Sequence, residues 1–460
     1  SLIFIHSFKV GDKSKKEGLC EMKDATAKDK YPEFEGLGLT DSEQVSYDRF
    51  RFWKVVILVS IWYSFYYLGR LNWGMCMPWM IKDLGITKTQ AGVGATVLFW
   101  SYAFGTLISG KLGDTYGARV MNTIGGIGTV ILNIIVASMA RINIMLIPWG
   151  FNGFIQGQAY APTNNMITQW YPKAKRGLAT GIFATSMGVA SLFVWLITGT
   201  VAAHYGWRAA FTYPLLFCTL PLTILFFILA RSKPKDAGYP EYKETMTNTI
   251  SSKAEELRDD QISGFKAWGL LFGNWKFVCL AVASFMLYMG RYGLLTWVPL
   301  YYAETAGINL KKIPIATIAL PLGMAVGPII AGWISDRFFK AKRYQILTIY
   351  MLAFTTIMII LASAGLKTLG LPLSFFLLAI GGFFVLGSVG LVFTPACDFG
   401  GRRMAGTAVG SVNFFNYMGA GTQGFVIGMI LDATKNWGIV FGLLSGCAIL
   451  GIILVNIVRE

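Results

Sequence analysis

The feature that most limits what this chain can fold into is a series of long uncharged runs. They recur from Phe52 almost to the C-terminus, and each is long enough to cross a bilayer core of about 30 Å. A backbone that crosses lipid must satisfy its own hydrogen bonds. Runs of this length do so as helices, because barrel strands would be shorter and would alternate in polarity. The sequence therefore predicts an all-α membrane protein.

Composition agrees with this prediction, since only 14% of the 460 residues are charged, against about 25% in an ordinary soluble domain. We count twelve runs and interpret each as one transmembrane helix. They cover residues 52–80, 89–110, 119–140, 143–169, 177–203, 208–230, 275–302, 313–333, 344–366, 370–396, 404–431 and 437–458.

Lysine and arginine are distributed unevenly between the two sets of loops. With a cytoplasmic N-terminus, 30 of the 40 basic residues fall in cytoplasmic segments and 8 in the opposite loops. Basic residues accumulate in cytoplasmic loops, so we expect a multi-pass protein of the plasma or inner membrane with both termini in the cytoplasm. The net charge of +16 lies in short loops, which argues against nucleic-acid binding.

Nothing in the sequence points to an enzyme. The six cysteines lack metal-ligand spacing, and the two histidines, His6 and His204, lie in the N-terminal tail and beside a helix end. No nucleophile has a neighbouring base, and no phosphate-binding loop occurs. We therefore expect neither a metal nor a cofactor. We expect a monomer whose partners are the lipid bilayer and a small-molecule substrate.

The chain divides into two halves that echo each other. Residues 1–50 form a polar tail that we expect to be mostly disordered and cytoplasmic, 51–230 a first six-helix bundle, 231–274 a cytoplasmic linker and 275–460 a second bundle. Arg70 recurs as Arg291, "GKLGDTYGAR" from Gly110 as "GWISDRFFKAKR" from Gly332, and "RGLATG" near "RMAGTAVG". Parallel repeats of this kind are typical of transporters, with the substrate site near the midplane between the halves.

The Gly110 and Gly332 motifs resemble the signature of the major facilitator superfamily and its degenerate copy. The resemblance implies twelve helices in two pseudo-symmetric six-helix bundles. The charged residues of these loops are expected to form ion pairs at cytoplasmic helix ends and to act as a conformational latch; simple helix capping and loop topology are the alternative. The latch candidates are Asp114, Arg119, Asp336 and Arg343.

Arg70 in "YYLGRLNW" and Arg291 in "YMGRYGLL" lie inside uncharged runs. A charged arginine near the bilayer centre costs between about 3 and more than about 10 kcal/mol, and guanidinium cannot shed its proton. We expect an anionic solute to supply the missing charge, held by one guanidinium from each half; snorkelling to an aqueous surface is the alternative. The nearby carboxylates all fall at helix ends or in loops: Asp83, Glu304, Asp398 and Asp432.

The sequences around the two arginines resemble the first and seventh helices of the organophosphate:phosphate antiporters. The resemblance implies that the arginines hold a phosphoryl group, alternately of an organophosphate and of inorganic phosphate, with Tyr63, Tyr67, Gln156 and Tyr417 lining the site. Tyr288 lies one helical turn before Arg291 and joins them. Each aromatic residue also has core packing as an alternative role. Weaker candidates are Tyr66, Gln158, Tyr160, Asn164, Asn413 and Asn416.

The chain departs from the glycerol-phosphate branch of that family. Met187 stands where the branch has a histidine, Thr106 where it has a lysine and Thr296 where it has an aspartate, and a glutamate near Pro321 is missing. Cations and carboxylates have disappeared together, which leaves the two arginines as the charge of the site. A sulfonate, phosphonate or carboxylate therefore fits the sequence as well as a phosphate.

Two rival functions stay open beside anion exchange by alternating access. A proton-coupled symporter of the anion:cation symporter family would share the fold, but Gln158 stands where proton-coupled members carry a glutamate, and symport needs a buried carboxylate. A nutrient sensor would bind the anion without moving it.

Overall fold

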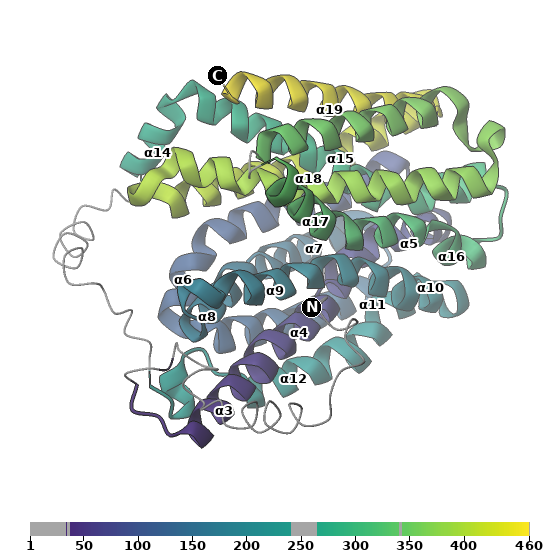
Figure 1. The fold of residues 1–460 in the computed structure, drawn as a ribbon. Coiled ribbons are helices and arrows are strands. Elements are labelled where there is room, and N and C mark those ends of the chain that lie inside the picture. The colour runs from purple at the N-terminus through teal and green to yellow at the C-terminus, as the bar shows by residue number, and fades with distance from the viewer. Residues whose placement is uncertain (1–33, 35–36, 241–264, 340–342, 460) are drawn as a thin grey trace, which may run out of the picture.

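The computed structural model describes residues 34, 37–240, 265–339 and 343–459, and every regular element in these ranges is a helix. Figure 1 shows the helices of the N-terminal half on one side of the molecule and those of the C-terminal half on the other. The predicted linker lies partly outside the described residues. The all-α fold with two helical halves is the one that the uncharged runs predict.

In chain order, the first half is built from α3 (Asp41–Phe50), η2 (Arg51–Ile57), α4 (Leu58–Tyr66), α5 (Leu68–Leu84), α6 (Lys88–Ser138), α7 (Ile142–Gln156), α8 (Tyr160–Trp170), α9 (Lys173–Phe193), η3 (Val194–Thr198), α10 (Gly199–Tyr205), α11 (Trp207–Pro214), η4 (Leu215–Thr219), α12 (Leu220–Leu229) and η5 (Pro234–Ala237). The long α6 changes direction at Gly117, whose φ of 75° is one that glycine adopts without strain. The segment α6 therefore consists of two helices that meet at Gly117.

The second half is built from α14 (Phe265–Gly273), α15 (Trp275–Thr305), η6 (Leu310–Lys312), α16 (Ile313–Thr317), α17 (Ala319–Phe338), α18 (Arg343–Thr434) and α19 (Trp437–Arg459). Figure 1 shows that α18 folds back on itself. Two of its glycines, Gly365 and Gly370, have positive φ values of 62° and 73°.

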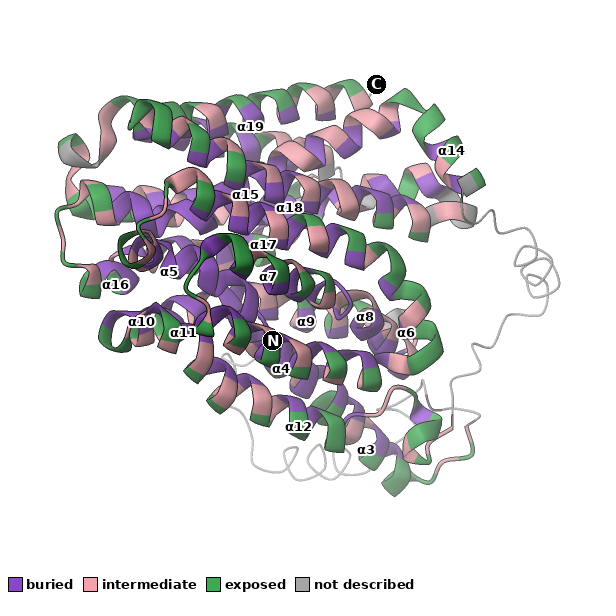
Figure 2. Ribbon diagram, turned by 180° about the vertical axis from the view of Figure 1, so that it is seen from behind, coloured by how far each residue is buried: buried purple, intermediate pink, exposed green. Residues whose placement is uncertain are grey.

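The exposed surface of the bundles is apolar, as a lipid-facing surface should be. Ile224 and Ile228 of α12 are 50% and 55% exposed, and Ile453 of α19 is 51% exposed. Figure 2 shows exposed residues on the outer faces and buried ones where the halves meet. Nine helical stretches in the described ranges are long and apolar enough to cross a membrane. One of them, Lys88–Ser138, covers the predicted run 89–110 and all but the last two residues of the run 119–140, and the count of twelve stays a prediction.

The prediction of a disordered tail is wrong for residues 41–50, which form α3. Thr40 and Glu43 make a capping box at its start. Tyr47 is fully buried, with its ring 5.6 Å from that of Trp170 and 4.6 Å from that of Tyr239. The many charged residues of this segment suggested disorder, although its aromatic residues pack on the first bundle.

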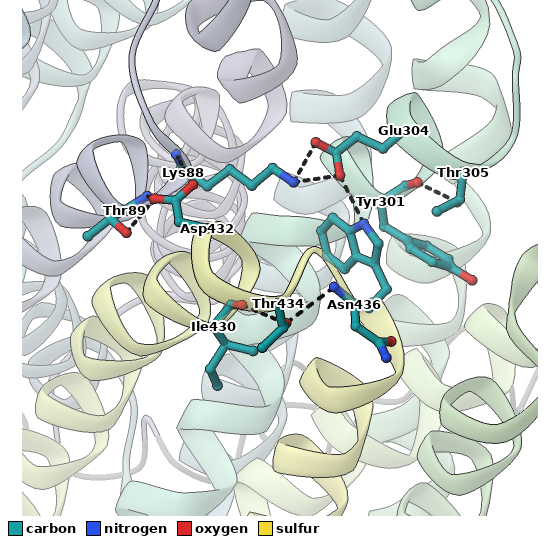
Figure 3. A network of polar contacts seen from close by, with 10 residues as sticks. Lys88, Thr89, Tyr301, Glu304, Thr305, Ile430, Asp432, Thr434 and Asn436 are labelled. Carbon is teal, nitrogen blue, oxygen red and sulfur yellow. Dashed lines mark hydrogen bonds and ion pairs between the residues drawn. The ribbon is translucent and has the colours of Figure 1, made fainter.

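The two halves are joined at the end of the bundle that carries the loops at residues 85–87 and 435–436, which we call the distal end. Asp432 of α18 accepts hydrogen bonds from the backbone N–H of Lys88 at 3.1 Å and of Thr89 at 2.8 Å. Lys88 Nζ also pairs with Glu304 of α15 at 2.8 Å, and Trp437 donates to Glu304 at 3.0 Å (Figure 3). A carboxylate of one half thus caps a helix N-terminus of the other.

Beside this network, α6 and α18 touch backbone to backbone. A Cβ atom on Gly92 would overlap the carbonyl oxygen of Gly424. Thr96 Oγ1 donates to the carbonyl of Gly421 at 2.7 Å and accepts from the N–H of Phe425 at 3.0 Å. The halves are therefore closed against each other at the distal end.

At the opposite end, which we call the linker end, a cavity lies between the halves. A cavity of about 450 Å³ is lined there by Thr106 and Gly110 of α6, Ala161 of α8, Trp268 of α14 and Ser411 of α18. These residues come from both halves, so the cavity lies at their interface on the side of the linker.

We expect acid to loosen the distal closure. Burial raises the pKa of Asp432, but the hydrogen bonds from Thr89 and Lys88 outweigh it, so the pKa lies below its ordinary value. A group with a lowered pKa stabilises the closed contacts above its ordinary pKa, and this contribution is lost as the pH falls through the lowered value. Closure should therefore weaken below about pH 4.

The measurement is the rate at which a water-soluble thiol reagent modifies a cysteine introduced as Ala95→Cys, a buried position on this face of α6. Adding Asp432→Asn should speed the modification several-fold at neutral pH. The matched control is Asp83→Asn, because Asp83 pairs with Arg208 inside the first half. Equal rates in the two variants would mean that Asp432 does not hold the halves together.

Candidate functional site

The two arginines lie buried in the middle of the molecule. Arg70 lies on α5, three residues after the interruption at Tyr67 that separates α4 from α5. Arg291 lies in the middle of the unbroken α15. The two side chains are 2% and 3% exposed, so neither reaches a surface as the snorkelling alternative requires.

Neither guanidinium has a carboxylate partner among the residues that the structure describes. The ion pairs seen there, such as Lys88 with Glu304, lie at helix ends. Nε and Nη2 of Arg70 and Nε of Arg291 are buried without any hydrogen-bond partner. An unsatisfied buried donor costs about 1–3 kcal/mol, and more when it is charged. These N–H groups are therefore available to a ligand.

Tyrosine rings surround both guanidinium groups. Arg70 Cζ lies 3.6 Å from the ring centre of Tyr67 and 5.0 Å from that of Tyr102. Arg291 Cζ lies 4.8 Å from the ring centre of Tyr292 and 5.4 Å from that of Tyr288. Cation–π contacts attract each cation without neutralising it. The positive charge of the site is therefore retained.

Tyr417 of α18 connects the two sets of rings. Its ring centre lies 4.0 Å from that of Tyr102 on α6 and 5.6 Å from that of Tyr288 on α15. A continuous aromatic surface therefore runs from Arg70 in the first half to Arg291 in the second. We call Tyr67, Tyr102, Tyr288, Tyr292 and Tyr417 the tyrosine cage.

Two members of the cage, Tyr102 and Tyr292, are absent from the candidates that the sequence supplied. A feature of the sequence around each of them could have indicated a place in the site. Tyr102 lies inside an uncharged run in "LFWSYAFG", and Tyr292 directly follows Arg291. A buried tyrosine has an apolar ring and a hydroxyl that seeks a polar partner.

The remaining candidate tyrosines divide into two groups. Tyr63 lies beside the cage, with its ring 5.3 Å from that of Tyr67 and 6.3 Å from that of Tyr160. Tyr66 instead stacks on Trp62 at 4.7 Å, and its hydroxyl donates to the carbonyl of Ile155 at 3.3 Å. Tyr66 therefore packs into the first bundle.

Most of the candidate amide side chains are bonded to backbone. Gln156 donates to the carbonyl of Tyr66 at 3.2 Å, Gln158 to that of Gly105 at 3.0 Å, and Asn164 to that of Tyr160 at 3.0 Å. Asn416 differs, because it is 1% exposed and its Oδ1 and Nδ2 both lack a partner. Asn413 is half-buried.

Two of the latch candidates, Asp114 and Arg119, bond within the first half. Asp114 accepts a hydrogen bond from Asn165 at 2.6 Å, and Arg119 Nε donates to the carbonyl of Phe227 at 2.6 Å. The side chains of Asp336 and Arg343 lie outside the described residues. A latch between the halves stays a prediction.

Comparison with known proteins places the chain among membrane transporters. Residues 59–424 match the Major Facilitator Superfamily. The chain is 28% identical over 433 residues to the probable hexose phosphate transport protein of Chlamydia trachomatis, covering 90% of this chain and 93% of that protein. It is 28% identical to the glycerol-3-phosphate transporter of Bacillus subtilis, covering 90% and 94%.

Two further similarities concern a sensor and a solved structure. The membrane sensor protein UhpC of Escherichia coli is 26% identical, with 88% of this chain and 92% of that protein covered. The crystal structure of a D-xylose-proton symporter superposes with a TM-score of 0.67 at 14% identity, covering 88% of this chain and 97% of that one. At this identity the superposition speaks for the fold alone.

Proposed function

Because this chain belongs to the Major Facilitator Superfamily, we propose that it is a secondary transporter that carries a small organic anion, an organophosphate or a similar phosphonate, sulfonate or carboxylate, by alternating access. We further propose that it exchanges this cargo for inorganic phosphate or another anion. The relatives named as hexose phosphate and glycerol-3-phosphate transport proteins favour the organophosphate. They are transporters rather than enzymes.

The observation that carries this proposal is the pair of buried guanidinium groups, one from each half, with N–H donors that have no partner. Guanidinium matches the geometry of phosphate and carboxylate oxygens and can bond to them in a bidentate way. An anion bound by Arg70 and Arg291 would supply the counter-charge that the described helices lack. The tyrosine cage would supply apolar walls and hydroxyl groups around it.

The same charges account for coupled exchange. An empty site holds two positive charges, which disfavours closure into a dry cavity, whereas a bound anion largely cancels them. The loaded protein therefore changes conformation more readily than the empty one. With both termini in the cytoplasm, the distal end faces outward and the cavity at the linker end faces the cytoplasm.

Proton symport is less well supported, because no Asp or Glu is among the buried side chains of the residues that the structure describes. A sensor is favoured by one observation, the likeness to UhpC. The two functions share a binding site and differ in whether the bound anion crosses the membrane. A transport assay therefore separates them.

Purified protein in liposomes preloaded with inorganic phosphate should take up labelled glycerol-3-phosphate or glucose-6-phosphate without a pH gradient. The same anions should raise the melting temperature in detergent, since a ligand that binds the folded state stabilises it. Uptake that strictly requires a pH gradient would favour symport. A thermal shift without any flux would favour a sensor.

A further inference from the structure

We propose that Asn133, Asn152 and Gln156 are positioning residues that hold the interrupted backbone before Arg70 and so fix the direction of its guanidinium group. We call these three side chains the amide girdle. The inference rests on the proposed function, in which Arg70 binds the anion, and adds how the protein keeps that arginine in place.

The backbone before Arg70 is not a regular α-helix. The N–H of Arg70 bonds to the carbonyl of Tyr67 at 3.1 Å, a bond between residues three apart instead of four. This tighter turn leaves the carbonyl of Tyr66 without its usual partner. A buried carbonyl without a hydrogen bond is rarely tolerated, so a partner must come from elsewhere in the fold.

Gln156 supplies the donor that the carbonyl of Tyr66 lacks, and Asn133 and Asn152 add two donors to the carbonyl of Gly69. Gln156 Nε2 donates to the carbonyl of Tyr66 at 3.2 Å. Asn133 Nδ2 and Asn152 Nδ2 both donate to the carbonyl of Gly69, at 3.1 Å and 2.8 Å. All three side chains are 0% exposed. Tyr66 directly precedes the turn that ends at Arg70 and Gly69 lies within it, so the three amides bind the interrupted backbone itself.

Two further contacts make this arrangement rigid. Asn72 Nδ2 donates to Asn133 Oδ1 at 2.8 Å, which orients that amide. Gly69 lies so close to α6 that a Cβ atom there would overlap the methyl group of Thr129. The backbone on the N-terminal side of Arg70 is therefore held against α6 and α7 at adjacent points.

The second half shows why a girdle is needed at Arg70. Arg291 lies inside the unbroken α15, whose own backbone hydrogen bonds fix it. Arg70 follows an interruption, so its direction depends on side chains of other helices. The girdle residues act through Arg70 and its backbone, which distinguishes them from side chains that contact the anion.

The test uses Asn152→Leu and Gln156→Leu, which remove the donors and keep side chains of similar size. In phosphate exchange, we expect the KM for inorganic phosphate to rise about 10- to 100-fold, as displacement of a binding group by about 1 Å can produce. Amide hydrogen exchange of the peptide that covers residues 63–72 should accelerate in the same variants. Asn72→Ala removes only the hydrogen bond that orients Asn133. It should raise the KM and the hydrogen-exchange rate by less, and it replaces a leucine variant that fails to insert.

The matched control is Asn122→Leu. It removes a buried amide bond, from Nδ2 to Thr163 Oγ1 at 2.8 Å, in the same bundle but away from Arg70. It should leave the KM and the hydrogen exchange of residues 63–72 unchanged.

An unchanged KM in both leucine variants would overturn the inference. So would a raised KM with unchanged hydrogen exchange, because the amides would then contact the anion themselves. If the wild-type protein exchanges neither phosphate nor an organophosphate, the proposed function fails instead. Hydrogen exchange of residues 63–72 then tests the amide girdle by itself. An unchanged exchange rate in both leucine variants would reject the inference that the girdle holds the turn.

Discussion

Arg70→Lys and Arg291→Lys are each expected to abolish anion exchange while the protein still folds and inserts. An ammonium group is a point charge and cannot reproduce the planar donor fork of guanidinium. Each charge-assisted hydrogen bond that is lost contributes about 1.5–3 kcal/mol, so losing two lowers the exchange rate by about 100-fold or more. Counterflow of labelled phosphate in liposomes, normalised to inserted protein, measures this loss.

The matched control is Arg141→Lys, because Arg141 is exposed beside the start of α7. It should leave exchange close to wild type. Near-normal exchange by either Arg70→Lys or Arg291→Lys would remove the observation on which the proposed function depends. A variant that no longer inserts is replaced by Arg→Gln at the same position, which keeps a planar donor group without the charge.

Gly92→Leu should also abolish exchange, but by a different route. A Cβ atom at this position already overlaps the carbonyl oxygen of Gly424, so a leucine prevents α6 and α18 from meeting at the distal end. Alternating access needs each end to close in turn. A protein that cannot close its distal end therefore completes no cycle.

Two measurements identify this route. Exchange should be lost, and the cysteine introduced as Ala95→Cys should react faster with a water-soluble thiol reagent. Gly442→Leu on α19 is the control, since a Cβ atom there meets nothing within 4 Å. Normal exchange by Gly92→Leu would show that the backbone contact between α6 and α18 is not part of the cycle.

The fold could be predicted because hydropathy and charge act over whole helices. Uncharged runs and the repeat of Arg70 as Arg291 identified the two bundles and the central pair of cations. The helix α3 was missed because its packing depends on Tyr47, Trp170 and Tyr239, which lie far apart in the sequence. Charge alone made that segment resemble a disordered tail.

The details of the site could be predicted only in part. Tyr67, Tyr288 and Tyr417 were found from the resemblance and from helical spacing, and all three belong to the cage. The interruption at Tyr67 could not be predicted, because the donors that stabilise it come from α6 and α7. The hydrogen-bond partner of an amide side chain depends on neighbours that only the folded protein brings together.

Because neither Arg70 nor Arg291 has a carboxylate partner in the described part of the chain, we expect the protein to be sensitive to voltage. Each elementary charge that crosses a membrane exchanges about 2.3 kcal/mol with a potential of 100 mV. If the termini are cytoplasmic, a negative cell interior attracts the two bare guanidinium groups inward and holds the empty protein with its cavity toward the cytoplasm. A bound dianion cancels that pull. The electric field would then slow the conformational change of the empty protein alone, which favours one-for-one exchange.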